Sequence, residues 1–354
     1  MNRKHEIRLG MIGVGMIGAE HMRGIEVVPR CKVAAIADRD ADRLRFIASE
    51  FSLDRCYDNA QTLLEQDDID GVVICTPPEN HEALVLEAIA QGKHVLCEKP
   101  LALNPAGAQR IARRSKRAGL LVGSCSGRFR FSPTVVKAKE MIDSGELGEI
   151  YHVRVSGVSR RNRPGIDYHA PAKWNLDKSK SGGGALMDWG IYDLNILHYL
   201  LPNVDIKRVD GFCYRGVDEP DVGDHVFDVE EHGGAQMRSQ DGLVVTWERA
   251  WAAHMNRRPC LRIYGSRAGL AFNPFVWSKD VYFEIYEDRG GKPVTISPDT
   301  DFSGWNVHIS LALDFVNAIQ KKRPPMTTPD DEAQVLKIID AVYRSQQKDA
   351  SVGV

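Results

Sequence analysis

Two short stretches of this 354-residue chain carry side chains that could move a proton on a hydroxyl group. The first is Glu98-Lys99-Pro100, which directly follows the apolar run 94–97. A strand over this run would place the tripeptide at its carboxyl end, the edge of an open α/β sheet where ligands bind. There the Lys99 side chain could give a proton as an ammonium group or take a hydroxyl proton as a neutral amine. On the tripeptide alone, a surface lysine in a turn is the simpler alternative.

The second stretch begins with three glycines, 182–184, and continues as a predicted helix over 184–201. Asp188 and Tyr192 are four residues apart, so both side chains should project from one face of this helix. A carboxylate and a phenol on one face could grip a polyol and serve a proton transfer. The alternative is a first-turn acid favoured by the helix dipole, together with a half-buried tyrosine.

Three glycines near the N-terminus predict a dinucleotide site. Gly13, Gly15 and Gly18 lie between an apolar run at 7–12 and a helical pattern that Pro29 ends. Gly13 permits a tight turn, Gly15 allows backbone to approach a pyrophosphate, and Gly18 allows close packing of helix on strand. A second apolar run, 31–37, ends at Asp38, about 20 residues beyond the glycines as this fingerprint requires. A tight turn that binds nothing is the alternative.

The acid and its neighbour indicate which dinucleotide binds. Asp38 could accept hydrogen bonds from both ribose hydroxyl groups and would repel a 2′-phosphate, which favours NAD. Arg39 could instead hold that phosphate, so NADP remains an alternative.

The composition excludes several classes of protein. The chain has 46 basic and 48 acidic residues, so it indicates neither a nucleic-acid nor a membrane partner. Its seven cysteines form no CxxC pair, so we expect no metal knot and no disulfide framework, as is typical of the cytoplasm. No apolar run reaches about 18 residues, the length of a membrane-spanning helix.

The pattern of elements predicts an α/β chain with two domains. Strands and helices alternate over 1–125, with strands at 72–75, 94–97 and 120–122, which predicts a doubly wound parallel sheet. Period-2 alternation then predicts a large, mostly antiparallel, open-faced sheet within 126–354. Among its expected parts are a strand at 226–230 and hairpin loops at 232–234 and 288–291. Two helices, 306–320 and 329–346, close the chain and could pack back on the first domain.

Together these motifs carry a resemblance. The glycine run 13–18, Thr76-Pro77-Pro78, Glu98-Lys99-Pro100 and the block 182–193, in this order, resemble the Gfo/Idh/MocA oxidoreductase family. The resemblance spans nearly the whole chain, including the segment 335–345. It implies a Rossmann domain, a C-terminal α+β domain whose open sheet often forms homodimers or homotetramers, and NAD(P)-linked sugar or polyol chemistry.

The resemblance also implies roles for residues. Lys99 matches the catalytic lysine and Asp188 the helix aspartate, whereas Tyr192 stands where inositol dehydrogenases carry a catalytic histidine, which puts inositol itself in doubt as substrate. We expect these three residues to be catalytic and to contact substrate. The expected cofactor-binding residues are Gly13, Gly15, Met16, Ile17, Gly18, Asp38, Arg39, Thr76, Pro77, Asn80, His81, Glu98, Lys99 and Arg128.

Two further residues are expected to touch substrate. Arg163 lies in the basic loop 159–165, which could contact an acidic or phosphorylated sugar, and Trp174 could stack on a sugar ring. An exposed loop without an anion and a tryptophan packed beneath it are the alternatives. Likewise, His81 could lie on a helix surface and Arg128 could form a surface salt bridge.

The sequence therefore predicts an NAD-dependent oxidoreductase that transfers hydride between the nicotinamide and a carbinol or carbonyl carbon of a sugar, polyol or glycoside. One alternative keeps NAD tightly bound for transient oxidation, as in glycosidases or paired sugar conversions. The other is a non-catalytic sensor of NAD(P) or sugar.

Overall fold

The computed structural model describes residues 6–218, 221–255, 257–275, 281–298 and 305–354. By its contacts the chain divides into two compact units, residues 1–128 with 306–333, and residues 129–305 with 334–354. Among the described residues, no helix has the length and apolar character needed to cross a membrane.

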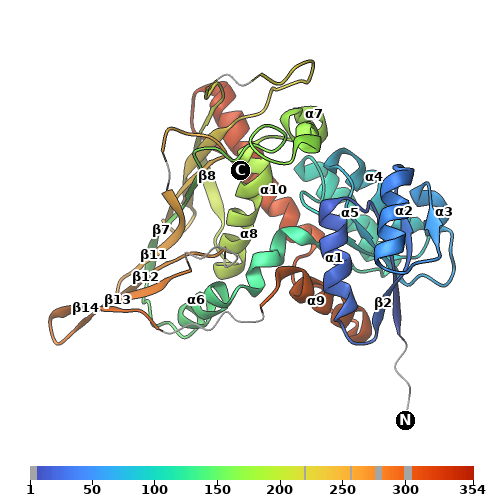
Figure 1. Ribbon diagram of the computed structural model, residues 1–354. Coiled ribbons are helices and arrows are strands. Elements are labelled where there is room, and N and C mark those ends of the chain that lie inside the picture. Colours follow the sequence, from blue (N-terminus) through green and yellow to red (C-terminus); the bar gives the residue numbers. More distant parts are fainter. Residues whose placement is uncertain (1–5, 219–220, 256, 276–280, 299–304) are drawn as a thin grey trace, which may run out of the picture. The chain divides into compact units, whose positions relative to one another are not determined.

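The first unit is built on a six-stranded parallel sheet with the strand order β3-β2-β1-β4-β5-β6 (Figure 1). The chain moves outward from β1 in one direction and then restarts at β4 on its other side. This reversal is the topological switch point at which open α/β sheets bind ligands. The strands are β1 (Ile7–Ile12), β2 (Cys31–Ala37), β3 (Cys56–Tyr57), β4 (Gly71–Ile74), β5 (His94–Cys97) and β6 (Val122–Ser124).

Side-chain caps fix where the helices of this unit begin. Asp40 accepts the backbone N–H groups of Asp42 and Arg43, and Asn104 accepts that of Gly107. Such caps satisfy N–H groups that have no partner within the helix. The helices are α1 (Met16–Glu26), α2 (Ala41–Glu50), α3 (Ala60–Leu64), α4 (His81–Ala90), α5 (Pro105–Ala118) and α9 (Val307–Lys321), with α10 (Pro329–Lys348) beginning here.

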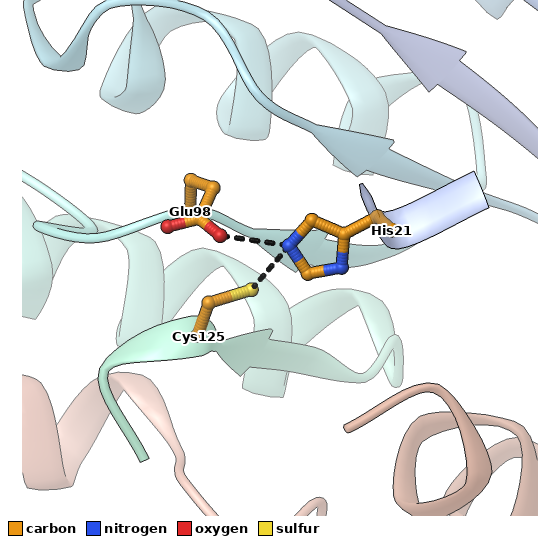
Figure 2. A group of neighbouring side chains, drawn as sticks. All are labelled: His21, Glu98 and Cys125. Atoms are coloured by element: carbon orange, nitrogen blue, oxygen red, sulfur yellow. Dashed lines mark hydrogen bonds and ion pairs between the residues drawn. The ribbon is translucent and has the colours of Figure 1, made fainter. Parts of the chain in front are cut away.

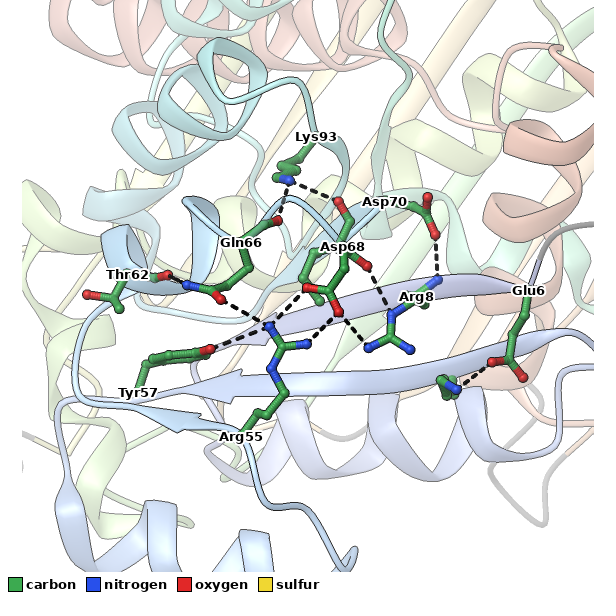
Figure 3. Close-up of polar contacts among 11 residues, drawn as sticks. Glu6, Arg8, Arg55, Tyr57, Thr62, Gln66, Asp68, Asp70 and Lys93 are labelled. Carbon is green, nitrogen blue, oxygen red and sulfur yellow. Dashed lines mark hydrogen bonds and ion pairs between the residues drawn. The ribbon is translucent and has the colours of Figure 1, made fainter.

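A polar network ties together the amino ends of these strands (Figure 3). The backbone N–H of Arg8 donates to Asp70 at 2.8 Å, and Asp68 accepts bonds from the guanidinium groups of both Arg8 and Arg55, each at 2.7 Å. The ammonium group of Lys93 donates to two backbone carbonyl oxygens before β4. The network lies at the opposite edge from the ligand-binding ends of the strands, so we assign it to holding the sheet together.

The second unit contains a nine-stranded sheet with the order β14-β13-β12-β11-β7-β10-β9-β8-β15. Only the β10–β7 pair is parallel among its described strand pairs. The strands are β7 (Ile150–Val158), β8 (Ile206–Tyr214), β9 (His232–Ser239), β10 (Val244–Ala250), β11 (Arg257–Gly265), β12 (Ala268–Phe272), β13 (Phe283–Arg289), β14 (Lys292–Ile296) and β15 (Val352–Gly353).

Helices cover one face of this sheet (Figure 1). A Cβ atom added at Gly211 on β8 would lie 2.8 Å from Val342 of α10, so only glycine permits this approach. The segment before α8 (Ile191–Leu200) packs equally closely, since Gly190 faces the ring of Trp247 on β10. On the other face, Phe212 and Tyr214 of β8 and Tyr286 of β13 are exposed. The predicted fold class is therefore confirmed.

Several predicted elements differ in detail. Residues 226–230 form an irregular segment, because the Glu230 carboxylate accepts the N–H groups of Gly184 and Leu186 and its backbone serves that turn. The predicted loop at 232–234 is wrong, since these residues begin β9, where Gly233 and Gly234 pack beneath neighbouring side chains. The turn at Gly290-Gly291 is confirmed.

Two further boundaries shift. The predicted strand at 120–122 begins instead at Val122, because Gly119 ends α5 in a left-handed conformation and the chain needs two residues to reach the sheet. The predicted helix 184–201 divides into a π-helical turn, Leu186–Gly190, followed by α8.

Candidate active site

The three glycines of the first unit form a turn between β1 and α1. Gly13 has φ +86°, and a Cβ atom there would lie 2.8 Å from the carbonyl group of Cys75, so this position requires glycine. At Gly18 a side chain would meet the carbonyl oxygen of Gly13. Gly15 differs, because the nearest atom to its Cβ position is the Arg43 guanidinium at 3.9 Å. The protein leaves space at Gly15, where a pyrophosphate would approach the start of α1.

Asp38 is fixed at the carboxyl end of β2 beside this turn. Its Oδ2 accepts the backbone N–H of Val14 at 2.8 Å and its Oδ1 accepts that of Asp40 at 2.9 Å. Arg39 is exposed, whereas Nη1 of Arg43 lies 4.0 Å from Oδ2 of Asp38. Our sequence analysis missed Arg43, although its place in the first turn of the helix after Asp38 was an available signal.

A buried carboxylate holds the backbone of Lys99. Glu98 follows β5, and its Oε2 accepts the N–H of Lys99 at 3.0 Å. Its Oε1 contacts Nε2 of His21 at 2.7 Å and pairs with the guanidinium of Arg128. Burial raises the pKa of Glu98, but Arg128 and His21 outweigh this effect and hold it well below its ordinary value. The carboxylate therefore stays charged and keeps its hydrogen bond to the backbone N–H of Lys99. The peptide bond between Lys99 and Pro100 is cis.

The cluster around Glu98 also has the donor types of a metal site. His21, Glu98 and Cys125 place one potential ligand atom each within 4.8 Å of one another (Figure 2). However, the Arg128 guanidinium binds the same Glu98 oxygen that would face a metal ion. Burial also raises the pKa of Cys125 well above its ordinary value, which disfavours the thiolate that a metal requires. We therefore interpret the cluster as an ion-pair network behind Lys99.

In the second unit, several aromatic side chains lie near Asp188. The indole Nε1 of Trp251 donates to Oδ2 of Asp188 at 2.9 Å. Burial and the Asp188 carboxylate raise the pKa of the Tyr168 phenol, which is hydrogen-bonded to Trp189. The ring of Tyr192 is 4% exposed and makes edge contacts with Phe129 and Trp189, with ring centroids 5.0 and 5.7 Å apart. Our sequence analysis missed Tyr168 and Trp251, because only the fold brings them to this helix.

Comparisons with known proteins agree with this geometry. Residues 7–124 match the model of an oxidoreductase family with an NAD-binding Rossmann fold, and residues 135–271 match the C-terminal domain model of the Gfo/Idh/MocA family. The chain belongs to the Gfo/Idh/MocA oxidoreductase family. This confirms the resemblance predicted from the sequence, and the first unit carries the NAD-binding Rossmann domain of that family.

Relatives within the family cover nearly the whole chain. The myo-inositol 2-dehydrogenase of Thermotoga maritima is 29% identical over 98% of each chain. The D-glucoside 3-dehydrogenase of Escherichia coli is 23% identical over 96% of this chain and 95% of its own length. A levoglucosan dehydrogenase, solved with NADH and levoglucosan, has the same fold, with a TM-score of 0.88 at 23% identity over 98% of this chain and 99% of its own.

The turn after β4 fits the NAD of this family. The Oγ1 atom of Thr76 is buried, and no hydrogen-bond partner lies near it within the described parts of the chain. A buried hydroxyl group without a partner is costly, so a bound ligand would stabilise it. Pro77 is half-buried beside it, and the carbonyl of Pro77 accepts a bond from Asn80 at 3.4 Å. At the start of α1, Met16 is 60% exposed and Ile17 half-buried.

Other predicted ligands have different surroundings. Arg163 is fully buried, and its guanidinium donates to Asp167 at 2.8 Å, to Glu231 at 3.0 Å and to the carbonyl of Val217. Because this arginine serves the protein's own acceptors, the structure does not support the predicted substrate contact. Trp174 is half-buried in the 3-10 segment Ala170–Leu176.

Two interpretations of polar residues need correction. The alternative of a surface position for His81 is wrong, because the ring is fully buried. The surface salt bridge considered for Arg128 is wrong as well, because Arg128 is 3% exposed and pairs with buried Glu98.

The basic loop that contains Arg163 also borders a cavity. Arg160 and Arg161 line this cavity of about 570 Å³ together with Ser159, Asn162 and Asp218.

Proposed function

We propose that this chain is an NAD-dependent dehydrogenase that transfers hydride between the nicotinamide and a carbinol or carbonyl carbon of a sugar or polyol. The observation that carries this proposal is the hydrogen bond that the buried Glu98 carboxylate accepts from the backbone N–H of Lys99. It fixes a lysine at the carboxyl end of β5, on the ligand-binding edge of the NAD-binding sheet.

Each residue has a separate part in this proposal. Lys99 or Tyr192 takes the proton of the substrate hydroxyl group, and Asp188 accepts a hydrogen bond that orients the sugar. Trp251 holds the Asp188 carboxylate by one oxygen. Bound NAD would supply the hydride acceptor. The glycine turn, Asp38 and the Thr76 hydroxyl would hold it.

NAD is favoured over NADP by the position of Asp38. Its carboxylate is already fixed by two backbone N–H groups, so it cannot swing away from a 2′-phosphate. The same two bonds would present it to ribose hydroxyl groups.

The substrate class follows from the relatives, which act on inositol, a glucoside and levoglucosan. Aromatic side chains near a carboxylate, as at Asp188, suit a sugar ring. The apolar face of such a ring can pack against aromatic side chains, and its hydroxyl groups can bond to the carboxylate. We therefore include cyclic polyols, glycosides and anhydrosugars among the candidates.

We further propose a homodimer or homotetramer formed by the uncovered face of the nine-stranded sheet. Exposed Phe212, Tyr214 and Tyr286 on this face are typical of the aromatic residues enriched at interfaces. Light scattering should show an assembly, and Phe212→Glu with Tyr286→Glu should shift it toward the monomer. A wild-type monomer at micromolar concentration would contradict this proposal.

The proposed activity is tested by the absorbance of NADH at 340 nm. Myo-inositol, methyl α-glucoside, levoglucosan and sugar acids are each assayed with NAD and with NADP. We expect net NADH formation with at least one sugar, and a preference for NAD. Tight retention of NAD without net NADH would instead indicate transient oxidation, and failure of every sugar in both directions would contradict the dehydrogenase.

A further inference from the structure

His81 connects the two turns that face the ligand edge of the NAD-binding sheet. It is the first residue of α4 and is fully buried. Its Nδ1 lies 2.7 Å from the carbonyl oxygen of Pro100, in the turn after β5. Its Nε2 lies 2.7 Å from the carbonyl oxygen of Thr76, in the turn after β4. One ring therefore spans the two segments that carry Lys99 and the Thr76 hydroxyl group.

Both partners of the ring are acceptors. A carbonyl oxygen has no hydrogen to donate, and a neutral imidazole carries only one N–H group. In a neutral His81 one of the two contacts would set a nitrogen lone pair against an oxygen lone pair in a buried site. Hydrogen on both nitrogens would satisfy both contacts, whereas the neutral ring donates to one carbonyl group and places its other nitrogen beside the second.

The charges that face this ring oppose one another. Burial lowers the pKa of His81 below its ordinary value, and the nearby ammonium of Lys99 acts in the same direction. The carbonyl groups of Pro100 and Thr76 and the carboxylate of Glu98 favour the charged ring. On its own helix, Glu82 is paired with Arg110 of α5. The neutral ring keeps one of the two short bonds to these carbonyl groups.

We propose that His81, whose ring lies between the Thr76 and Pro100 carbonyl groups and holds the two turns together, is a positioning residue for Lys99. Glu98 holds Lys99 from the preceding residue and His81 from the following one. The lysine backbone is thus fixed on both sides. This inference rests on the catalytic role proposed for Lys99.

The structural part is tested without any substrate. Two-dimensional ¹⁵N–¹H spectra of histidine-labelled wild-type protein at pH 7 should show a ring N–H of His81 that exchanges slowly with water, because the ring is fully buried. The signal is assigned by its loss in His81→Gln, or by contacts to the Pro100 ring if that variant does not fold. A ring hydrogen of His81 that exchanges as fast as that of an exposed histidine would overturn the bridge.

The functional part compares His81→Gln and His81→Leu with the wild type. Misplacing a catalytic group by about 1 Å can cost roughly 100-fold in rate, so we expect kcat to fall about 10- to 100-fold, more for Leu than for Gln. Glutamine keeps one donor group, whereas leucine keeps none. NADH affinity, measured by its fluorescence, should fall less than kcat does, because the glycine turn is untouched and only the Thr76 side of the cofactor site is disturbed.

His94→Gln is the matched control, because His94 lies at the amino end of β5 and its Nδ1 accepts the N–H of Leu121. Its kcat should stay near the wild-type value with the best of myo-inositol, methyl α-glucoside and levoglucosan. Lys99→Met is assayed in parallel. If it keeps full turnover, the catalytic proposal fails while the spectra still decide the bridge. If it loses turnover and His81→Gln does not, the positioning role is overturned.

Discussion

The indole Nε1 of Trp251 donates a hydrogen bond to the Asp188 carboxylate over 2.9 Å. Four residues earlier, Nε1 of Trp247 donates to Asp193 at 3.0 Å. The two tryptophans thus hold two aspartates of one helical segment. Asp193 also pairs with Arg249 and is 1% exposed, so its bond serves the core. Asp188 is the member of the pair that we assign to substrate.

Trp251→Phe should therefore impair catalysis more than folding. Hydrogen bonds to charged groups contribute about 1.5–3 kcal/mol, so we expect kcat/KM to fall roughly 10- to 100-fold as Asp188 loses its orientation. Trp247→Phe is the control and should lower the free energy of unfolding by about 1.5 kcal/mol with kcat/KM within about twofold. Steady-state kinetics and urea unfolding of both variants measure this contrast. Equal kinetic losses in the two would contradict a special role for Asp188.

Asp38→Ser should change the preference between cofactors. The substitution removes the charge that repels a 2′-phosphate, and it leaves the Arg43 guanidinium beside the site. We expect the NADP-to-NAD ratio of kcat/KM to rise by about 10-fold or more, with weaker NAD binding. Asp42→Ser is the control, because Asp42 pairs with Arg45 on the exposed side of α2. An unchanged NADP-to-NAD ratio of kcat/KM in Asp38→Ser would mean that another residue binds the ribose hydroxyl groups and sets the cofactor preference.

Asp167 should make the second unit sensitive to acid. Burial raises its pKa, but hydrogen bonds from Arg163 and Arg161 outweigh this effect and lower it below its ordinary value of 3.8. A lowered pKa means that the carboxylate stabilises the fold above pH 3.8, and that this stability is lost as pH falls through the folded-state value. Asp167→Asn should cost about 3 kcal/mol near pH 7, because it leaves the buried Arg163 with Glu231 as its remaining carboxylate partner.

Urea unfolding at pH 7, 4 and 3 checks this prediction. The difference between wild type and Asp167→Asn should shrink as the pH falls, since acid removes the same charge from the wild type. A difference that stays constant down to pH 3 would show that the hydrogen bonds matter and the charge does not.

Local patterns predicted the first unit well. Its strands alternate with helices, and Asp40, Asn59 and Asn104 each cap the helix that follows them. The second sheet was harder, because its register depends on partners distant in sequence. Gly233 and Gly234 suggested a loop, yet they lie in β9 where packing against Leu186 and Phe212 excludes side chains.

The residues of the candidate site also fall into those that local motifs predict and those that they do not. The glycine turn, Asp38, Lys99, Asp188 and Tyr192 stand in motifs that sequence reasoning can find. The predicted substrate contact of Arg163 lacks support, because the composition of the loop suggests an exposed side chain. In the structure this guanidinium is buried and paired with Asp167 and Glu231. Trp251 and Tyr168 carry no local signal, since a tryptophan at a strand end and a tyrosine in a loop gain meaning only from their neighbours.

The most direct test of the central claim is the turnover of Lys99→Met beside its NADH affinity. Lys99 is proposed to act on the substrate proton, so we expect kcat to fall about 10²- to 10⁴-fold while the Kd for NADH stays within about threefold of wild type. Lys93→Met is the control, because Lys93 donates to carbonyl groups at the opposite edge of the sheet. Near-normal turnover of Lys99→Met, with a folded and NADH-binding protein, would contradict the account.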